Sequence, residues 1–183
     1  AVAIQAKRNL TLHDPEGFRQ LVKEQVNSLR VNREYLLHKK FGTTEGAISR
    51  NMLGVYPTKN FRFGEMDGYQ QLSPEAYMER RVDEFGCYNC SARCGKKHLV
   101  PFGVYAGIDS EGPEYESLWA FSGPIDSNNI DATIAADRLC DDLGLDTIST
   151  GNCIGFAYEL YEKGIITKAD TDGLELDYGN HSA

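Results

Sequence analysis

Three cysteines crowd into one short segment of this chain. They are Cys87, Cys90 and Cys94, separated by two and then by three residues. A metal or iron–sulfur centre needs soft thiolate ligands that converge on one point, and spacers this short let one tight loop supply three of them. Basic residues within and just after the segment favour the thiolate form. The pattern therefore predicts a metal centre in a reducing compartment.

Three thiolates leave a four-coordinate centre one ligand short. His98, four residues after Cys94, completes a Cys3His zinc site. A ligand from a distant part of the chain instead completes a [4Fe–4S] cluster. The spacing supports both readings about equally, and three reduced cysteines without metal are the plain alternative. Cys140 and Cys153 stand apart, and we expect both to be small buried side chains.

A second segment with chemical potential, residues 141–151, joins two expected helices. Free backbone N–H groups at the start of the second helix favour an anion such as a phosphate. The carboxylates of Asp141 and Asp146 can instead accept hydrogen bonds from the ring N–H or amino groups of a ligand. Ordinary helix capping explains the same residues, and the motif by itself favours capping.

Glu114 and Glu116 flank Tyr115 in a segment that opens with Gly-Pro. A carboxylate beside a metal centre can act as a general acid or base. A pair of exposed surface glutamates is the commoner explanation of this pattern. The pattern therefore indicates a catalytic carboxylate only in combination with other motifs.

Composition narrows the class of protein. The 183 residues include 27 acidic and 19 basic side chains, for a net charge of −8, which argues against a general nucleic-acid binder. We find no apolar window long enough to span a membrane, and no signal or transit peptide. An odd number of cysteines, five, argues against a secreted disulfide scaffold. We therefore expect a cytoplasmic protein that is independent of membranes and nucleic acids.

Hydrophobic periodicity and capping signals predict a mostly α fold, a multihelical domain with long irregular connectors and little strand. We expect residues 1–183 to form one helical domain, with Asp14, Ser73, Asp126 and Thr150 as N-caps and residues 98–106 as the one extended stretch. The helical stripe after Asp14 predicts a core-facing helix. The expected helices are residues 14–40, 44–53, 73–85, 113–121, 128–142 and 150–163.

The chain begins at Ala1 without Met and ends without a terminating helix. We therefore expect it to be a piece of a longer chain.

Six motifs, taken together and in this order, resemble the tungsten-pterin aldehyde:ferredoxin oxidoreductase family. Their shared order and spacing are far more specific than any one of them. The motifs are Gly42-Thr43 with Tyr56-Pro57-Thr58-Lys59-Asn60-Phe61, the cysteine segment 86–95, Gly112-Pro113-Glu114-Tyr115-Glu116 with Trp119-Ala120, Leu139-Cys140 through Gly151, residues 155–164 and residues 173–180.

The resemblance implies two cofactors, a [4Fe–4S] cluster and a tungstopterin or molybdopterin. In the family the fourth cluster cysteine lies in a later helical domain, and a β-rich N-terminal domain covers the pterin. We expect both to lie outside this piece of the chain. The implied cluster ligands are Cys87, Cys90 and Cys94, and the implied pterin contacts are Asp141, Leu145 and Asp146.

The resemblance also implies an activity. Family members oxidise aldehydes to carboxylic acids with water and pass two electrons through the cluster to ferredoxin, with the cofactor carrying out the oxidation. One of Glu114 and Glu116 falls at the carboxylate near the metal, and spacing favours Glu116. The implied partners are ferredoxin, an aldehyde and the remaining domains of the parent chain, with a homodimer as a further option.

The departures from the family pattern limit what this piece does by itself. None of the four histidines has Glu three positions earlier, so the interface iron that some members hold is not implied. We expect the isolated chain to be catalytically inactive and to bind a cluster weakly or not at all. The rival interpretations are a small zinc-stabilised Cys3His binding module and an electron-transfer subunit without pterin.

Overall fold

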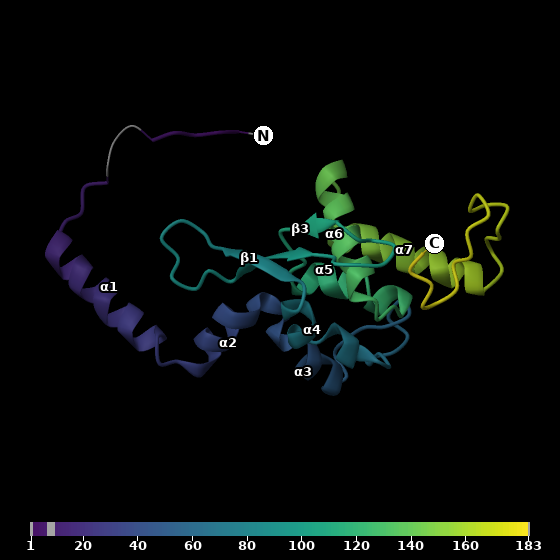
Figure 1. The fold of residues 1–183 in the computed structure, drawn as a ribbon, viewed down its shortest axis with the longest axis horizontal. Coiled ribbons are helices and arrows are strands. Elements are labelled where there is room, and N and C mark those ends of the chain that lie inside the picture. The colour runs from purple at the N-terminus through teal and green to yellow at the C-terminus, as the bar shows by residue number, and fades with distance from the viewer. Residues whose placement is uncertain (1, 7–9, 183) are drawn as a thin grey trace. The chain divides into compact units, whose positions relative to one another are not determined.

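A computed structural model describes residues 2–6 and 10–182 and is mostly helical, as the sequence predicts (Figure 1). The strands form one antiparallel sheet in the order β1-β2-β3. Within the described residues, no helix combines the length and apolarity needed to cross a membrane. The elements are α1 (Pro15–Leu29), α2 (Arg33–Phe41), α3 (Ala47–Met52), α4 (Pro74–Met78), β1 (Arg81–Phe85), β2 (Gly95–Leu99), β3 (Asp109–Ser110), α5 (Tyr115–Ala120), α6 (Ile130–Leu143) and α7 (Thr147–Glu162), with 3-10 helices at Gly42–Gly46, Tyr69–Leu72 and Gly123–Ile125.

The chain divides into two compact units, Ala1–Leu36 and Leu37–Ala183. Helix α1 of the first unit begins as predicted, because the Asp14 carboxylate accepts the Gly17 N–H at 2.9 Å. The predicted continuous helix over residues 14–40 is wrong, since α1 ends at Leu29. The Asn32 side chain then accepts the Tyr35 N–H at 2.8 Å and caps a new helix. The apolar stripe of α1 buries none of its described side chains, contrary to the core-facing prediction.

The predicted helix over residues 73–85 is correct at its start and wrong at its end. Ser73 caps α4 by accepting the Ala76 N–H at 3.2 Å, but α4 stops after Met78 and strand β1 follows. The strand forms because β1 pairs with β2, where acidic residues of β1 lie opposite lysines of β2. The expected extended stretch 98–106 is wrong in its bounds, because the strand β2 that pairs with β1 starts at Gly95 and ends at Leu99.

The last two helices begin at caps other than those predicted. Asn129, and not Asp126, caps α6 by accepting the Ala132 N–H at 2.9 Å. Asp146, and not Thr150, caps α7 by accepting the Ser149 N–H at 2.8 Å. The expectation for the isolated cysteines holds for Cys140, which is buried; it is wrong for Cys153, which α7 exposes to solvent.

The hydrophobic core of the second unit centres on α5, which packs against α6 and α7 (Figure 1). Leu118 and Ala120 of α5 are fully buried. Gly151 lets α7 approach closely, because a Cβ there would lie 2.2 Å from the Ala120 carbonyl oxygen. The core cluster comprises Ala47, Tyr56, Met66, Leu72, Tyr77, Val100, Leu118, Ile130 and Ile134.

We predict that Leu118→Ala lowers the free energy of unfolding by about 2–5 kcal/mol, because it leaves a cavity in a closed core. Leu139→Ala is the matched control, since Leu139 is 58% exposed, and its effect should stay within about 0.5 kcal/mol. Urea denaturation followed by circular dichroism measures both. Equal losses in the two variants would contradict the placement of the core at α5.

Candidate functional site

The three cysteines lie together on the loop that joins β1 to β2. Cys87 and Cys90 are exposed, Cys94 is partly buried, and all three are free thiols. A turn closes between the first two, because the Cys90 N–H donates to the Cys87 carbonyl at 3.0 Å. Across the described part of the chain, no three His, Cys, Asp or Glu side chains gather as a metal-binding group. Three thiols on one short loop are the type of side chain that ligates iron–sulfur and zinc centres.

His98 is engaged elsewhere in the structure. It lies in β2 opposite Arg81, about 10 Å along the strand from Gly95, the first residue after Cys94. Its Nδ1 lies 2.5 Å from the Gly112 carbonyl oxygen, and its ring packs edge-on against Tyr77 at 5.4 Å between centroids. The side chain is 3% exposed, and this burial lowers the pKa of His98. His98 therefore holds the segment before Glu114 in place.

The aspartate loop takes the form that capping chemistry predicts. The Asp146 carboxylate accepts the Ser149 N–H at the start of α7, and this hydrogen bond lowers the pKa of Asp146. Gly144 ends α6 in a left-handed conformation. Asp141 and Leu145 are exposed, so their side chains are free of the core.

Glu114 and Glu116 have different surroundings. The Thr43 hydroxyl donates to the Glu114 carboxylate and accepts the Tyr115 N–H at 2.8 Å. Glu116 is exposed and lines a cavity of about 250 Å³. Glu116 is therefore the carboxylate of the two with access to a small ligand. The cavity is lined by His38, Thr43, Glu45, Gly46, Arg50, Tyr115 and Glu116.

The segment Gly42-Thr43 connects the cysteine loop to the carboxylates. Gly42 has a φ of +70°, and a Cβ there would lie 2.8 Å from the Cys94 carbonyl oxygen. The next residue, Thr43, contacts Glu114. The sequence pattern indicates no such role for Gly42 or Thr43, because each contact joins residues that are far apart in the sequence.

A hydrogen bond joins the carboxylate helix to the aspartate loop. The Ser117 hydroxyl of α5 donates to the Thr147 hydroxyl, the first residue of α7, at 2.9 Å. Ser117 follows Glu116 directly, and Thr147 follows Asp146. The structure thus brings the carboxylate segment and the aspartate loop side by side.

Residues 20–183 match the sequence model described as aldehyde ferredoxin oxidoreductase, domains 2 & 3. The chain belongs to the aldehyde ferredoxin oxidoreductase family. It is 38% identical over 185 residues to the tungsten-containing aldehyde ferredoxin oxidoreductase of Pyrococcus furiosus, and 37% identical over 186 residues to that of Thermococcus kodakarensis. Each comparison covers 98% of this chain and 30% of the relative, so the chain spans less than a third of the length of these relatives.

The chain also has a shorter match to another oxidoreductase. The WOR-like subunit of an aliphatic sulfonate oxidoreductase from Pyrococcus furiosus is 41% identical over 97 residues. That comparison covers 52% of this chain and 15% of the relative.

In this member of the oxidoreductase family, α6 also buries a carboxylate outside the six motifs. Asp137 is 6% exposed and accepts the Ser110 hydroxyl of β3 at 2.6 Å. Burial raises the pKa of Asp137. A signal for it exists in the sequence, because Asp137 follows Ile130 and Ile134 at helical spacing and so falls on the apolar face of α6.

We predict that acid weakens the fold through His98. Its pKa in the folded chain is below the ordinary value of 6.5, so the unfolded chain binds this proton at a higher pH than the folded chain does. The contribution of His98 to stability is therefore complete above about pH 6.5 and declines as the pH falls below that value. Urea unfolding between about pH 7.5 and pH 5.5 measures this slope.

The matched variants are His98→Gln and His13→Gln, the second of which changes an exposed histidine. The slope should shrink in His98→Gln and persist in His13→Gln. An unchanged slope in His98→Gln would show that other groups cause the pH dependence.

Proposed function

We propose that this chain is the part of a tungstopterin or molybdopterin aldehyde oxidoreductase that holds the [4Fe–4S] cluster and contacts the pterin. One observation carries the proposal. Gly42-Thr43 joins Cys94 to Glu114, while Ser117 joins the carboxylate helix to the aspartate loop. The three predicted groups therefore sit on elements that contact one another, as an enzyme that couples oxidation to electron transfer requires.

The donor set of the cysteine loop suits the cluster better than it suits zinc. Cys87, Cys90 and Cys94 would hold three irons, and a fourth ligand would come from another part of the parent chain. The zinc alternative needs His98, whose Nδ1 lies beside the Gly112 carbonyl and whose ring is buried against Tyr77. A bound cluster supplies one-electron transfer to ferredoxin, which we propose as the partner.

Asp141, Leu145 and Asp146 would form the pterin contacts. The exposed side chains of Asp141 and Leu145 are accessible to a ligand. The Asp146 carboxylate already holds the start of α7, so its part is to fix the loop as well as to accept hydrogen bonds. The pterin-bound metal supplies the two-electron oxidation.

Glu116 is the proposed general base. Oxidation of an aldehyde with water to a carboxylic acid releases two electrons and two protons, so a group near the substrate must receive protons. Glu116 lines the cavity with His38 and Arg50, whereas Glu114 accepts the Thr43 hydroxyl. Glu114 is therefore proposed to position the segment and Glu116 to move the proton.

The isolated chain is proposed to be inactive, because it spans 30% of the length of its relatives and the resemblance implies a fourth cluster ligand and further pocket residues from other parts of the parent. The partners we propose are an aldehyde, ferredoxin and the remaining domains, with a homodimer as a further option and the cytoplasm as the location.

We predict that anaerobic reconstitution of this chain with iron and sulfide gives less than one cluster per chain, since one ligand is missing. The absorbance of the sulfur-to-iron charge-transfer band measures cluster content. Cys94→Ser should abolish the remaining signal, whereas Cys153→Ser, an exposed cysteine outside the loop, should preserve it.

A stable stoichiometric cluster in the isolated chain would contradict the claim of weak binding. One zinc per chain after aerobic purification, without the charge-transfer band, would favour the zinc-stabilised module over the oxidoreductase fragment.

We predict that Glu116→Gln lowers kcat of the parent-length enzyme by about 10²–10⁴-fold, the usual effect of removing a general base. Steady-state aldehyde oxidation with ferredoxin as acceptor measures this. Glu111→Gln, which changes an exposed glutamate outside the cavity, should leave kcat within about threefold of the wild type. Comparable losses in both variants would argue against a catalytic role for Glu116.

A further inference from the structure

Lys96 is a buried cation that the proposed function leaves unexplained. Its side chain is 4% exposed, although lysine is almost never fully buried without a partner. The Lys96 ammonium donates to the Lys39 carbonyl at 2.8 Å and to the Arg93 carbonyl at 2.9 Å, and it lies 3.4 Å from the Glu84 carboxylate. All three ammonium protons therefore have acceptors.

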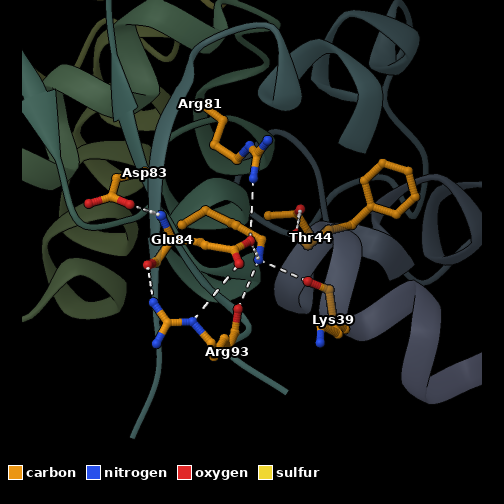
Figure 2. Close-up of polar contacts among 8 residues, drawn as sticks. Lys39, Thr44, Arg81, Asp83, Glu84 and Arg93 are labelled. Carbon is orange, nitrogen blue, oxygen red and sulfur yellow. Dashed lines mark hydrogen bonds and ion pairs between the residues drawn. The ribbon is translucent and has the colours of Figure 1, made fainter. Parts of the chain in front are cut away.

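The three acceptors come from three different segments, which Figure 2 shows around one point. Lys39 lies in the last turn of α2, where carbonyl groups lack partners within the helix. Arg93 belongs to the cysteine loop, and Glu84 belongs to β1. The Thr44 hydroxyl satisfies a second carbonyl at the end of α2, that of Phe41, at 2.9 Å. Lys96 thus ties the cysteine loop to the end of a helix and to a strand.

Arg93 is held in an uncommon conformation directly before the last cysteine. Its φ is +48°, in the left-handed region that costs free energy for a residue with a side chain. Its guanidinium donates to the Glu84 carbonyl at 2.8 Å, while its own carbonyl accepts from Lys96 (Figure 2). Gly42 lies against the Cys94 carbonyl on the next residue. Protein contacts therefore fix the end of the cysteine loop from several sides.

The charges at this point do not cancel. The single carboxylate of Glu84 lies 3.3 Å from Arg81 Nη1, 3.9 Å from Arg93 Nε and 3.4 Å from Lys96 Nζ. One negative charge therefore faces three positive charges. Around the Glu84 carboxylate the surplus is positive, and it lies at the base of a loop whose thiolates are negative when they bind metal. The neighbouring Asp83 carboxylate accepts the Glu84 backbone N–H at 2.8 Å.

We propose that Lys96 is a positioning residue for the cysteine loop. Its buried ammonium holds the Arg93 carbonyl, and with it the backbone that leads into Cys94, and sets positive charge at the base of the loop that carries the thiolates. The inference rests on the proposed function, because it assigns Lys96 to the centre that the three cysteines form.

The test compares Lys96→Met with Lys97→Met in the 183-residue chain. The two lysines are neighbours in β2, but Lys97 is 37% exposed and pairs with Asp109 at 2.7 Å. Each variant removes one positive charge from the same strand. In the metal-free chain, amide hydrogen exchange across residues 86–95 should become at least tenfold faster in Lys96→Met and stay within twofold of the wild type in Lys97→Met. Equal exchange in the two variants would overturn the proposal.

A cobalt titration then measures the effect on the site. The probe is Co²⁺ alone, followed by its thiolate charge-transfer absorption, with Cys94→Ser as the baseline. Affinity should fall at least tenfold in Lys96→Met and less than threefold in Lys97→Met, and Lys96→Arg, which keeps the charge and the donors, should restore most of it. Wild-type affinity in Lys96→Met would overturn the proposal while leaving the proposed cluster site intact.

Two further outcomes separate the inference from the proposed function. If the wild-type chain binds no Co²⁺ through its cysteines, hydrogen exchange by itself decides whether Lys96 holds the loop. The same Lys96→Met and Lys97→Met pair in the parent-length enzyme then tests the effect on the cluster, and a parent-length enzyme without a cluster refutes the proposed site. If Lys96→Met loses its helical circular dichroism, Lys96→Gln takes its place. Lys96→Gln keeps amide donors without the charge, so it should protect the loop amides partly and still lower Co²⁺ affinity. Wild-type behaviour of Lys96→Gln in both measurements would overturn the proposal.

Discussion

The antiparallel register of β1 and β2 is the constraint on which the rest of the site depends. Alternate residues of a strand face opposite sides, so this register buries Lys96 and His98 on one face of β2 while Lys97 remains partly exposed. The same pairing closes the cysteine loop at Phe85 and Gly95. A slip of one residue would turn both buried side chains to solvent and release everything they hold. The register therefore links loop geometry to core packing.

Each buried side chain of β2 supports a different functional segment. Lys96 satisfies carbonyls of α2 and of the cysteine loop, whereas His98 holds the carbonyl of Gly112, two residues before Glu114. Buried polar groups of this kind are costly unless they are fully paired. Strand β2 therefore holds both segments: Lys96 binds the cysteine loop, and His98 binds the carboxylate segment.

The parts of the fold that local chemistry determines could be predicted from the sequence. The Asp14 and Ser73 caps are of this kind, because each hydrogen bond spans three residues. The local pattern predicts helix where strand β1 forms, because the partner strand of β1 is supplied from beyond the cysteine loop. The contact between Thr43 and Glu114 spans 71 residues, so no local pattern could indicate it. Cysteine spacing revealed candidate ligands, but their relation to Lys96 needed the paired strands.

Gly42 has a consequence for how this family can diversify. The backbone of the cysteine loop lies where a side chain of residue 42 would be, and the next residue supports Glu114. Any substitution at this position would therefore disturb the electron-transfer end and the substrate end of the proposed site in one step. Mutational drift toward a new substrate is expected to avoid it. Such drift has more freedom at the cavity-lining side chains of His38 and Arg50, because these residues are not glycines packed against the backbone of the cysteine loop.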